Sequence, residues 1–415
     1  MNFLEKLLDG IVIEWKPISE ITLRTNNIKW REANRSYQYI DLTSVDIETK
    51  KILETSVVSS NDAPSRAQKL VEKDDVIFAT TRPTQMRYCL INEEYDGEVA
   101  STGYCVLRAN KKAVLPKWIL HLISTSEFKA YLEENQSGSA YPAISDAKLK
   151  EFKIPIPCPD NPKKSLEVQN EIVRILDTFS AMTAQLIDEL STRKKQFSYY
   201  RDQLFDFQDR GVKHLPMGRV EIGEFIRGGS FQKKDFTEIG VGCIHYGQIY
   251  TYYGTYTDKT KTYVSAELAK KCRKAKTGNL VIATTSENDE DVCKAVAWLG
   301  NEDIAISSDA CIYRHNLNPK YVSYFFQTEL FQSQKRQYIT GAKVRRVNAD
   351  HLAKILIPIP SEKEQARIVT ILDKFDVLTS SITEGLPREI KLRKQQYEYY
   401  RDLLLSFPKP EEVEA

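Results

Sequence analysis

Two regions of the sequence place arginine, lysine, glutamine, tyrosine and hydroxyl side chains beside glycine-containing turns. Such side chains suit contacts to DNA, because arginine can bind guanine through two hydrogen bonds and glutamine can bind adenine likewise, while others reach phosphates. The first region supplies the candidates Thr80, Thr81, Arg82, Arg87, Ser137 and Tyr141. The second supplies Gln232, Lys233, Tyr246, Gln248, Thr285, Lys343, Arg345 and Arg346. The alternative for each residue is a solvated loop side chain.

The sequence lacks the patterns that catalysis on DNA requires. An adenine methyltransferase needs a glycine loop for its cofactor and an Asn/Asp-Pro-Pro-aromatic segment for the flipped base, and the nearest strings, 225–229 and 160–163, miss the required residues. No Gly-x-x-x-x-Gly-Lys-Ser/Thr loop is present to bind nucleotide phosphates. Asp160 with Glu167 fits a turn followed by a first-turn acid better than a nuclease site. The five histidines and seven cysteines show no ligand spacing, so we predict no catalytic site, no metal site and no cofactor in this chain.

An internal repeat indicates which elements position the candidate residues. The repeated strings are Ile154-Pro155-Ile156-Pro157 with Ile357-Pro358-Ile359-Pro360, Ile175-Leu176-Asp177 with Ile371-Leu372-Asp373, and Tyr199-Tyr200-Arg201-Asp202 with Tyr399-Tyr400-Arg401-Asp402. The segments before them, such as 76–81 and 280–285, match more loosely. Two similar tails behind two dissimilar fronts indicate one scaffold that carries two different recognition surfaces.

The tails are predicted to be long helices. Apolar residues recur every three or four positions in 168–204 and in 368–404, which is a heptad seam, and each seam needs the other as its partner. At 1.5 Å per residue, a helix over 165–207 is on the order of 60 Å long. Ser165 is a candidate cap for the first helix, and Ser361 with Glu364 forms a capping box for the second. Pro387 predicts a break at 385–387, after which a second helical piece begins.

The fronts are predicted to be mixed α/β domains. Short β-branched runs alternate with helical spacing in 117–133 and 319–338, and tyrosines and glycines in 246–256 suggest a strand and hairpin. The predicted fold is therefore α/β (mixed α+β), with two globular domains separated by two long antiparallel helices that form a coiled-coil-like spacer. We place the boundaries at 1–160 (first domain), 161–212 (first helix), 213–360 (second domain), 361–408 (second helix) and 409–415 (tail).

The composition is that of a folded protein, and the charges nearly balance, so the chain has no strong overall electrostatic field. The 415 residues are 41% hydrophobic and 28% charged, and the net charge of +2 means that any DNA contact must come from local clusters. No long apolar stretch and no secretion signal is evident, so we expect a cytoplasmic protein with reduced thiols and no membrane contact.

The chain from Met1 to about Pro408 resembles the specificity subunit of type I restriction-modification systems. The resemblance rests on the duplicated Ile-Pro-Ile-Pro and Tyr-Tyr-Arg-Asp strings, on Arg193-Lys194-Lys195-Gln196-Phe197, and on Glu384-Gly385-Leu386-Pro387-Arg388-Glu389-Ile390. It implies a non-catalytic subunit whose two target recognition domains each read one half of a split double-stranded DNA target, while the helices set the spacing.

The resemblance also implies partner proteins. Two modification subunits would form an S-adenosylmethionine-dependent adenine methyltransferase with this chain, and restriction subunits would add ATP- and Mg-dependent translocation and cleavage. Two alternatives are a helical scaffold that binds only protein, and the recognition part of a self-sufficient restriction-modification enzyme. The second alternative is disfavoured because the chain begins with the first recognition domain and ends after the second helix, so we expect no room for a catalytic part.

Overall fold

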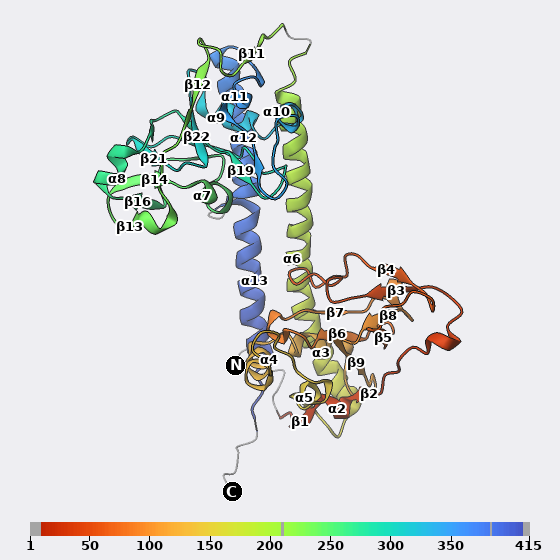
Figure 1. Cartoon of the computed structure of the whole chain (residues 1–415). Helices are drawn as coiled ribbons and strands as arrows, with labels where there is room; N and C mark the ends of the chain where they lie inside the picture. Colours follow the sequence, from red (N-terminus) through yellow and green to blue (C-terminus); the bar gives the residue numbers. More distant parts are fainter. Residues whose placement is uncertain (1–9, 209–210, 382–383, 410–415) are drawn as a thin grey trace. The chain divides into compact units, whose positions relative to one another are not determined.

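The computed structural model describes residues 10–208, 211–381 and 384–409, and the chain divides into two compact units. Unit 1 comprises residues 1–186 and 390–415, and unit 2 comprises residues 187–389. Each unit thus holds one divergent front and parts of both helical tails (Figure 1). Within the described ranges, no helix is long and apolar enough to span a membrane.

Unit 1 is built on two four-stranded sheets. The first has the order β2-β9-β6-β7, with β2 (Thr22–Leu23), β9 (Tyr104–Ala109), β6 (Val76–Ala79) and β7 (Tyr88–Leu90). The second has the order β4-β3-β8-β5, with β4 (Ser56–Val58), β3 (Tyr37–Ile40), β8 (Val99–Ser101) and β5 (Ala67–Leu70). A separate antiparallel pair joins β1 (Ile13–Pro17) to β10 (Lys153–Pro157). The Ile-Pro-Ile-Pro string of the first half is therefore an edge strand, the position in which a strand tolerates proline.

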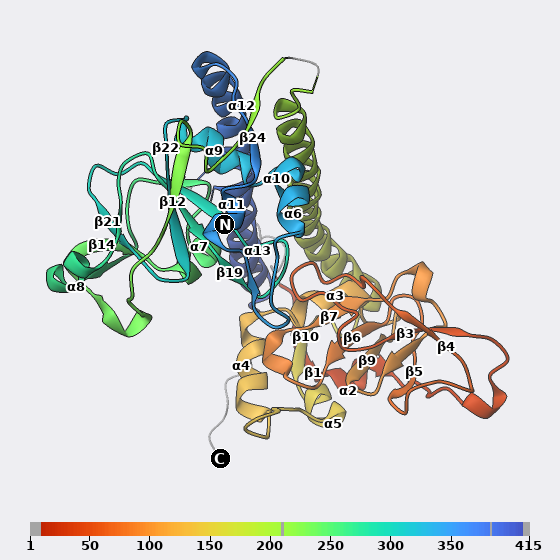
Figure 2. The ribbon, with the colours of Figure 1, turned by 45° about the horizontal axis from the view of Figure 1, so that its top comes forward.

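Short helices complete the front of unit 1. They are α2 (Ile18–Ile21), α3 (Pro116–Leu122), α4 (Ser126–Asn135) and α5 (Asp146–Lys150), with single 3₁₀ turns at η1 (Trp30–Glu32), η2 (Pro83–Gln85) and η3 (Glu93–Tyr95). Helix α3 lies against strands β6, β7 and β9 (Figure 2). The core is fully buried at Phe78 of β6, Trp118 of α3 and Phe128 of α4.

Unit 2 repeats this plan with different lengths. One sheet has the order β12-β22-β18-β20-β15, with β12 (Gly223–Arg227), β22 (Ala310–His315), β18 (Leu280–Ala283), β20 (Ala295–Trp298) and β15 (Tyr256–Thr257). The other has the order β13-β16-β14-β21-β17, with β13 (Phe236–Thr237), β16 (Thr262–Val264), β14 (Val241–Ile244), β21 (Ile304–Ile306) and β17 (Lys274–Ala275). Two small pairs join β11 (His214–Pro216) to β24 (Leu356–Pro358), and β19 (Thr285–Ser286) to β23 (Arg345–Arg346).

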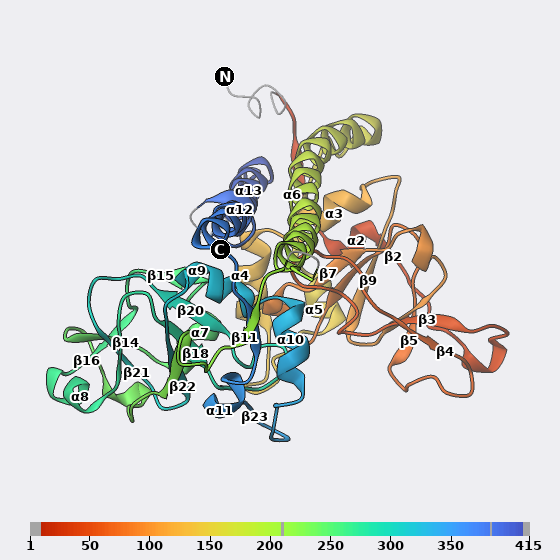
Figure 3. The same ribbon diagram turned by 90° about the horizontal axis from the view of Figure 1, so that it is seen from above.

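Short helices also complete the front of unit 2. They are α7 (Tyr246–Thr251), α8 (Ala266–Lys271), α9 (Pro319–Phe325), α10 (Glu329–Arg336) and α11 (Ala349–Leu352), with a 3₁₀ turn at η4 (Lys233–Asp235). Helix α9 lies between β20 and α12 (Figure 3). Thr328 caps α10 by accepting a hydrogen bond from the Phe331 amide, just as Thr125 caps α4 through the Phe128 amide. The repeat therefore extends into the fronts, where the sequence match is weak.

The long helices are α6 (Pro162–Leu204), α12 (Glu362–Ser380) and α13 (Gly385–Leu404). The two seams pack against each other within each unit, as predicted. In unit 1 the ring of Phe179 stacks on Tyr400 with centroids 5.3 Å apart, and in unit 2 Tyr200 stacks on Phe375 at 5.8 Å. These two pairs are equivalent positions of the repeat.

Repeated polar residues tie each front to the helices. The Asp of each Ile-Leu-Asp string binds a lysine of the front, Lys117 to Asp177 at 2.6 Å and Lys320 to Asp373 at 2.7 Å. The Asp of each Tyr-Tyr-Arg-Asp string accepts a hydrogen bond from a backbone amide at the start of α4 or α10: Asp402 from Ser126 and Asp202 from Glu329. The repeated strings are thus the sites where the domains dock on the helices.

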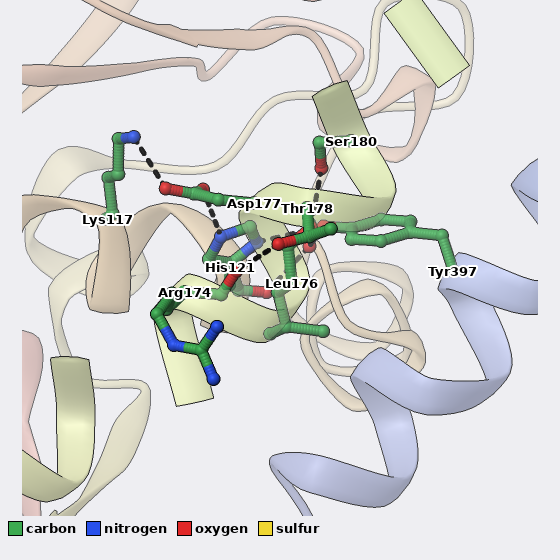
Figure 4. Close-up of polar contacts among 9 residues, drawn as sticks. Lys117, His121, Arg174, Leu176, Asp177, Thr178, Ser180 and Tyr397 are labelled. Atoms are coloured by element: carbon green, nitrogen blue, oxygen red, sulfur yellow. Dashed lines mark hydrogen bonds and ion pairs between the residues drawn. The ribbon is translucent and has the colours of Figure 1, made fainter. Parts of the chain in front are cut away.

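The dock of unit 1 contains a histidine that unit 2 lacks. His121 of α3 lies between Asp177 of α6, 3.1 Å from Nε2, and the hydroxyl of Tyr397 of α13, 2.9 Å from Nδ1 (Figure 4). In unit 2, Tyr324 takes the place of His121 and donates to Asp373 at 2.8 Å. Phe197 takes the place of Tyr397 and meets Tyr324 edge to face.

Three local predictions need correction. The segment 246–256 is not a strand and hairpin, because the side chains of His245 and Gln248 cap a helix, α7, at its start. Ser165 is not the cap of α6, since the helix begins at Pro162 and Asn161 accepts the Lys164 amide instead. The break in the second tail falls after Ser380, earlier than 385–387, and α13 begins at Gly385 with Pro387 in its first turn, where a missing amide costs little. The Ser361 cap is confirmed, because its hydroxyl accepts the Glu364 amide.

Candidate nucleic-acid interface

In unit 1, two segments far apart in the sequence meet at the end of the central strand β6. They are loop L1 (residues 80–87) and hairpin H1 (residues 137–143). Ala143 forms bridges with both Thr81 and Ser137, and the Arg82 amide donates to the Pro142 carbonyl at 2.6 Å. The hairpin requires Gly138, which has a φ of +95° and whose added Cβ would lie 3.1 Å from the Tyr141 carbonyl oxygen. Backbone pairing therefore fixes L1 and H1 to each other.

Four predicted residues gather at this junction. Arg82 is exposed and has a left-handed backbone (φ 50°), and its guanidinium carbon lies 5.2 Å from the centre of the Tyr141 ring. The Tyr141 side chain is 71% exposed, so the stacked pair is open to a ligand on the outside. Thr81 and Ser137 flank the pair through the bridges to Ala143. A planar cation on an aromatic ring, next to the exposed Ser137 and the half-buried Thr81, can contact a base edge or a phosphate.

Two other predicted residues of the first region serve the domain itself. The Thr80 hydroxyl is buried and donates to the Gly103 carbonyl at 3.0 Å. Arg87 donates to the Val45 carbonyl at 2.5 Å. Beside them, Lys50 lies over the Tyr88 ring at 4.4 Å, and burial lowers its pKa to about 8. Thr80 and Arg87 therefore attach the two ends of L1 to the rest of the domain.

Unit 2 builds the same junction with other side chains. Loop L2 (residues 284–291) meets hairpin H2 (residues 340–346) through the pairing of β19 with β23, and a bridge between Thr340 and Arg346 closes the hairpin itself. Gly341 has a φ of +92°, and its added Cβ would lie 2.1 Å from the Val344 carbonyl oxygen, so this hairpin also needs glycine. The structure thus brings together Thr285, Lys343, Arg345 and Arg346, as it brings together the four residues of the first junction.

The basic side chains of H2 are not equally free. Lys343 and Arg346 are exposed. Arg345 instead makes an ion pair from Nε to Oδ1 of Asp289 at 2.8 Å and donates from Nη1 to the Gly341 carbonyl at 2.6 Å. Thr285 is buried, and its carbonyl accepts from the Tyr250 hydroxyl at 2.7 Å.

The remaining predicted residues lie around the start of α7. Gln232 and Lys233 are exposed at η4, and Tyr246 is half-buried. Gln248 is buried and serves the fold, because its Oε1 accepts the His245 amide at 3.0 Å and its Nε2 donates to the Thr262 hydroxyl at 3.0 Å. Burial, with Lys233 nearby, lowers the pKa of His245 and favours its neutral form.

The sequence prediction missed two residues of the second junction. Asp289 belongs to an acidic run (287–291) whose ion pair with Arg345 spans a long stretch of chain, so local pattern does not show it. Lys335 of α10 is fully buried and donates to the carbonyls of Asp289, Glu290 and Val292. The helical spacing of 319–338 predicts that Lys335 lies in a helix, but it does not indicate that the ammonium is buried and binds three carbonyls. Among residues 10–208, 211–381 and 384–409, no cluster of three or more potential metal ligands occurs.

Comparison with known proteins gives consistent matches over nearly the whole chain. The sequence model of the type I restriction modification DNA specificity domain matches residues 17–192 and again 220–392. The EcoR124I/EcoR124II type I restriction enzyme specificity subunit of Escherichia coli is 35% identical over 100% of this chain and 99% of its own length. A putative type I specificity subunit of Haemophilus influenzae is 28% identical over 98% of both chains. A chain from a solved type I restriction-modification system has 20% identity, a TM-score of 0.64 and coverage of 95% of this chain and 97% of its own.

Proposed function

This chain belongs to the family of type I restriction-modification specificity subunits, and we propose that its two domains read the two halves of a bipartite DNA target through the L1–H1 and L2–H2 junctions. The DNA-recognition role follows from the family. The assignment of the two junctions as the reading surfaces is the new element.

The observation that carries the proposal is the duplication of one junction with two different sets of side chains. In both units a loop after the central strand is bridged to a glycine hairpin at matching positions, Thr81 with Ala143 and Thr285 with Arg346. The side chains differ: unit 1 has an arginine on a tyrosine, and unit 2 has the exposed Lys343 and Arg346 beside an Arg345 that pairs with Asp289. Two domains that recognise different DNA sequences require the same backbone frame with different side chains.

The long helices are proposed to set the distance between the half-sites. Helix α6 runs unbroken for 43 residues and contributes to both units. At 1.5 Å per residue it is about 65 Å long, which exceeds the diameter of a small domain. A stiff element of this length resists changes of spacing more than a flexible linker does.

Exposed tyrosines on the helices are proposed to dock two methyltransferase subunits. Tyr199 is 61% exposed and Tyr399 is 65% exposed, and each packs edge to face on the following tyrosine. Aromatic residues at exposed positions are typical anchors of protein interfaces. Because the patch occurs twice, it fits two copies of one partner.

Catalysis is assigned to those partners. The sequence carries neither the base-pocket motif nor the nucleotide loop, so we propose that modification subunits supply S-adenosylmethionine chemistry and that restriction subunits supply ATP- and Mg-dependent cleavage.

A filter-binding assay with mixed genomic DNA fragments, run with and without methyltransferase subunits, tests the proposal. We expect retention of a defined subset of fragments, and a variant with residues 213–360 taken from another such subunit should change one half of the retained sequence only. Binding without sequence preference, or a change in both halves, would contradict the assignment. Retention of the methyltransferase subunits without any DNA binding would support a scaffold that binds only protein.

A further inference from the structure

Loop L2 carries negative charge into the proposed DNA surface of unit 2. Residues 287–291 read Glu-Asn-Asp-Glu-Asp, whereas H2 contributes Lys343, Arg345 and Arg346. An acidic segment disfavours binding of phosphate, so its presence beside a basic hairpin calls for an explanation. The contact that joins the two segments is the ion pair between Asp289 and Arg345.

The backbone of the acidic segment is held by hydrogen bonds from the buried Lys335. Lys335 is fully buried, and its ammonium donates hydrogen bonds to the carbonyls of Asp289 at 2.7 Å, Glu290 at 3.0 Å and Val292 at 3.0 Å. Asn288 also accepts the Asp291 amide at 2.7 Å. The position of the Asp289 backbone is therefore fixed by the domain core.

The ion pair contributes little to folding. The side chains of Arg345 and Asp289 are 35% and 51% exposed, and pairs of this kind add little stability. Unit 1 builds the equivalent junction without an acid, since L1 contains Arg82 and Arg87 and no Asp or Glu. Asp289 is thus not needed for the junction to form.

The geometry of the pair restricts how Arg345 can bind. The carboxylate of Asp289 lies 2.8 Å from Nε as an ion pair, and the Gly341 carbonyl accepts a hydrogen bond from Nη1, so the guanidinium is held at two of its three nitrogens. An arginine held in this way presents its remaining donors in one orientation, whereas a free arginine reaches any nearby phosphate. Bidentate recognition of guanine needs one fixed orientation.

We propose that Asp289 is a positioning residue that raises sequence discrimination in the second half-site: it orients Arg345 for a base edge and repels the phosphates of other sequences. This inference rests on the proposed function of the L2–H2 junction. It assigns opposite effects to Asp289 on the two kinds of DNA, favourable on the cognate site and unfavourable on random sequence.

The test uses the full chain assembled with its methyltransferase subunits. Selection from a random duplex library first defines the two half-sites of the wild-type complex, and affinities for that cognate duplex and for a scrambled duplex are then measured for Asp289→Asn. We expect the scrambled duplex to bind more tightly and the ratio of cognate to scrambled affinity to fall by about tenfold, with the lost selectivity confined to the second half-site. Glu287→Gln is the matched control, because it removes the same charge from the same loop at an exposed position, and Asp289→Glu should restore part of the ratio.

The outcomes distinguish a failure of the proposed function from a failure of the role of Asp289 alone. A wild-type complex that selects no sequence would overturn the proposed function itself. A wild-type complex that selects a sequence, with an unchanged ratio in Asp289→Asn, would overturn only the role of Asp289, whether both affinities rise, fall or stay the same. An equal loss of ratio in Glu287→Gln would assign the effect to loop charge and would also overturn the role of Asp289. Thermal unfolding of each variant distinguishes these results from a loss of folded protein.

Discussion

The Nδ1 atom of His121 lies 2.9 Å from the hydroxyl of Tyr397, whereas the equivalent residues of unit 2, Tyr324 and Phe197, meet through their rings with centroids 6.3 Å apart. At this position unit 1 therefore has a polar contact and unit 2 an aromatic one, while both units keep a polar contact to the Asp of the Ile-Leu-Asp string. Both ring nitrogens of His121 therefore have a partner on the helices, Nε2 the carboxylate of Asp177 and Nδ1 the hydroxyl of Tyr397.

Replacing Tyr397 by Phe should destabilise unit 1 by roughly 1–3 kcal/mol, because Nδ1 of the buried His121 loses its hydrogen-bond partner. The double variant His121→Tyr with Tyr397→Phe copies the pair of unit 2 and should recover much of that loss. Hydrogen exchange of peptides from 116–135, compared among the wild type and both variants, measures the loss and its recovery. Wild-type protection in Tyr397→Phe would show that the hydrogen bond has no energetic role.

Asp177 should make the dock of unit 1 sensitive to acid. Burial acts to raise the pKa of its carboxyl, but the hydrogen bonds from His121 and Lys117 outweigh burial and leave the pKa below its ordinary value. A carboxyl whose pKa is lowered by folding stabilises the protein above its unfolded-state pKa of about 3.9, and this contribution is lost as the pH falls through the folded-state pKa.

Asp177→Asn should therefore cost roughly 1–2 kcal/mol at pH 7, discounted for partial exposure of the carboxylate, and the cost should shrink toward pH 3. Urea unfolding of the variant and the wild type between pH 3 and pH 7 gives the comparison. A difference that stays constant over this range would refute the linkage.

Lys335→Met should destabilise unit 2 by roughly 2–4 kcal/mol, because three carbonyls lose a charged donor in the core. Lys374→Met, which alters an exposed lysine of the same unit, should change the free energy of unfolding by less than about 0.5 kcal/mol. Hydrogen exchange of peptides from 280–298, measured across a urea series, reports on this unit. Similar midpoints for the two variants would contradict the anchoring role of Lys335.

Arg82→Ala should weaken binding to the cognate duplex by about 1–3 kcal/mol and relax the base preference in one half-site only. Arg346→Ala should act on the other half-site, because Arg346 belongs to the second junction. Sequencing of methylated positions for each variant shows which half has changed. Loss of preference in both halves from either single substitution would show that the junctions do not read separately.

The sequence predicted the contacts between the domains and the long helices better than the contacts within each domain. Asp177 and Asp373 repeat because each pairs with a lysine of its front, and Asp202 and Asp402 repeat because each binds the start of a helix. Such contacts are the same in both halves and leave a visible signature.

Contacts within one front leave no such signature. The helix α7 was missed because the tyrosines of 246–251 favour a strand, and the capping by His245 and Gln248 overrides that preference. The pairing of Asp289 with Arg345 joins segments that only the tertiary fold brings together. Residue type beside a glycine turn predicts Arg82, Tyr141 and Arg346 as DNA contacts, and they stay predictions; the same rule predicts Gln248, whose side chain the structure uses within the domain.

The spacing between half-sites should follow the length of α6. Four residues inserted within 185–190 fall where the two units adjoin along the chain, so contacts inside each unit are kept. The insertion adds about one helical turn and roughly 6 Å, and it leaves the seam on nearly the same face. Since base pairs rise about 3.4 Å each and the domains must also follow the rotation of the duplex, the accepted spacer should grow by about one or two base pairs while both half-sites are retained.

Inserting two residues instead rotates the seam by roughly 200° and should weaken assembly without resetting the spacing. Genome-wide mapping of methylated sites distinguishes these results, and an active four-residue variant with an unchanged spacer would show that the helices do not set the distance.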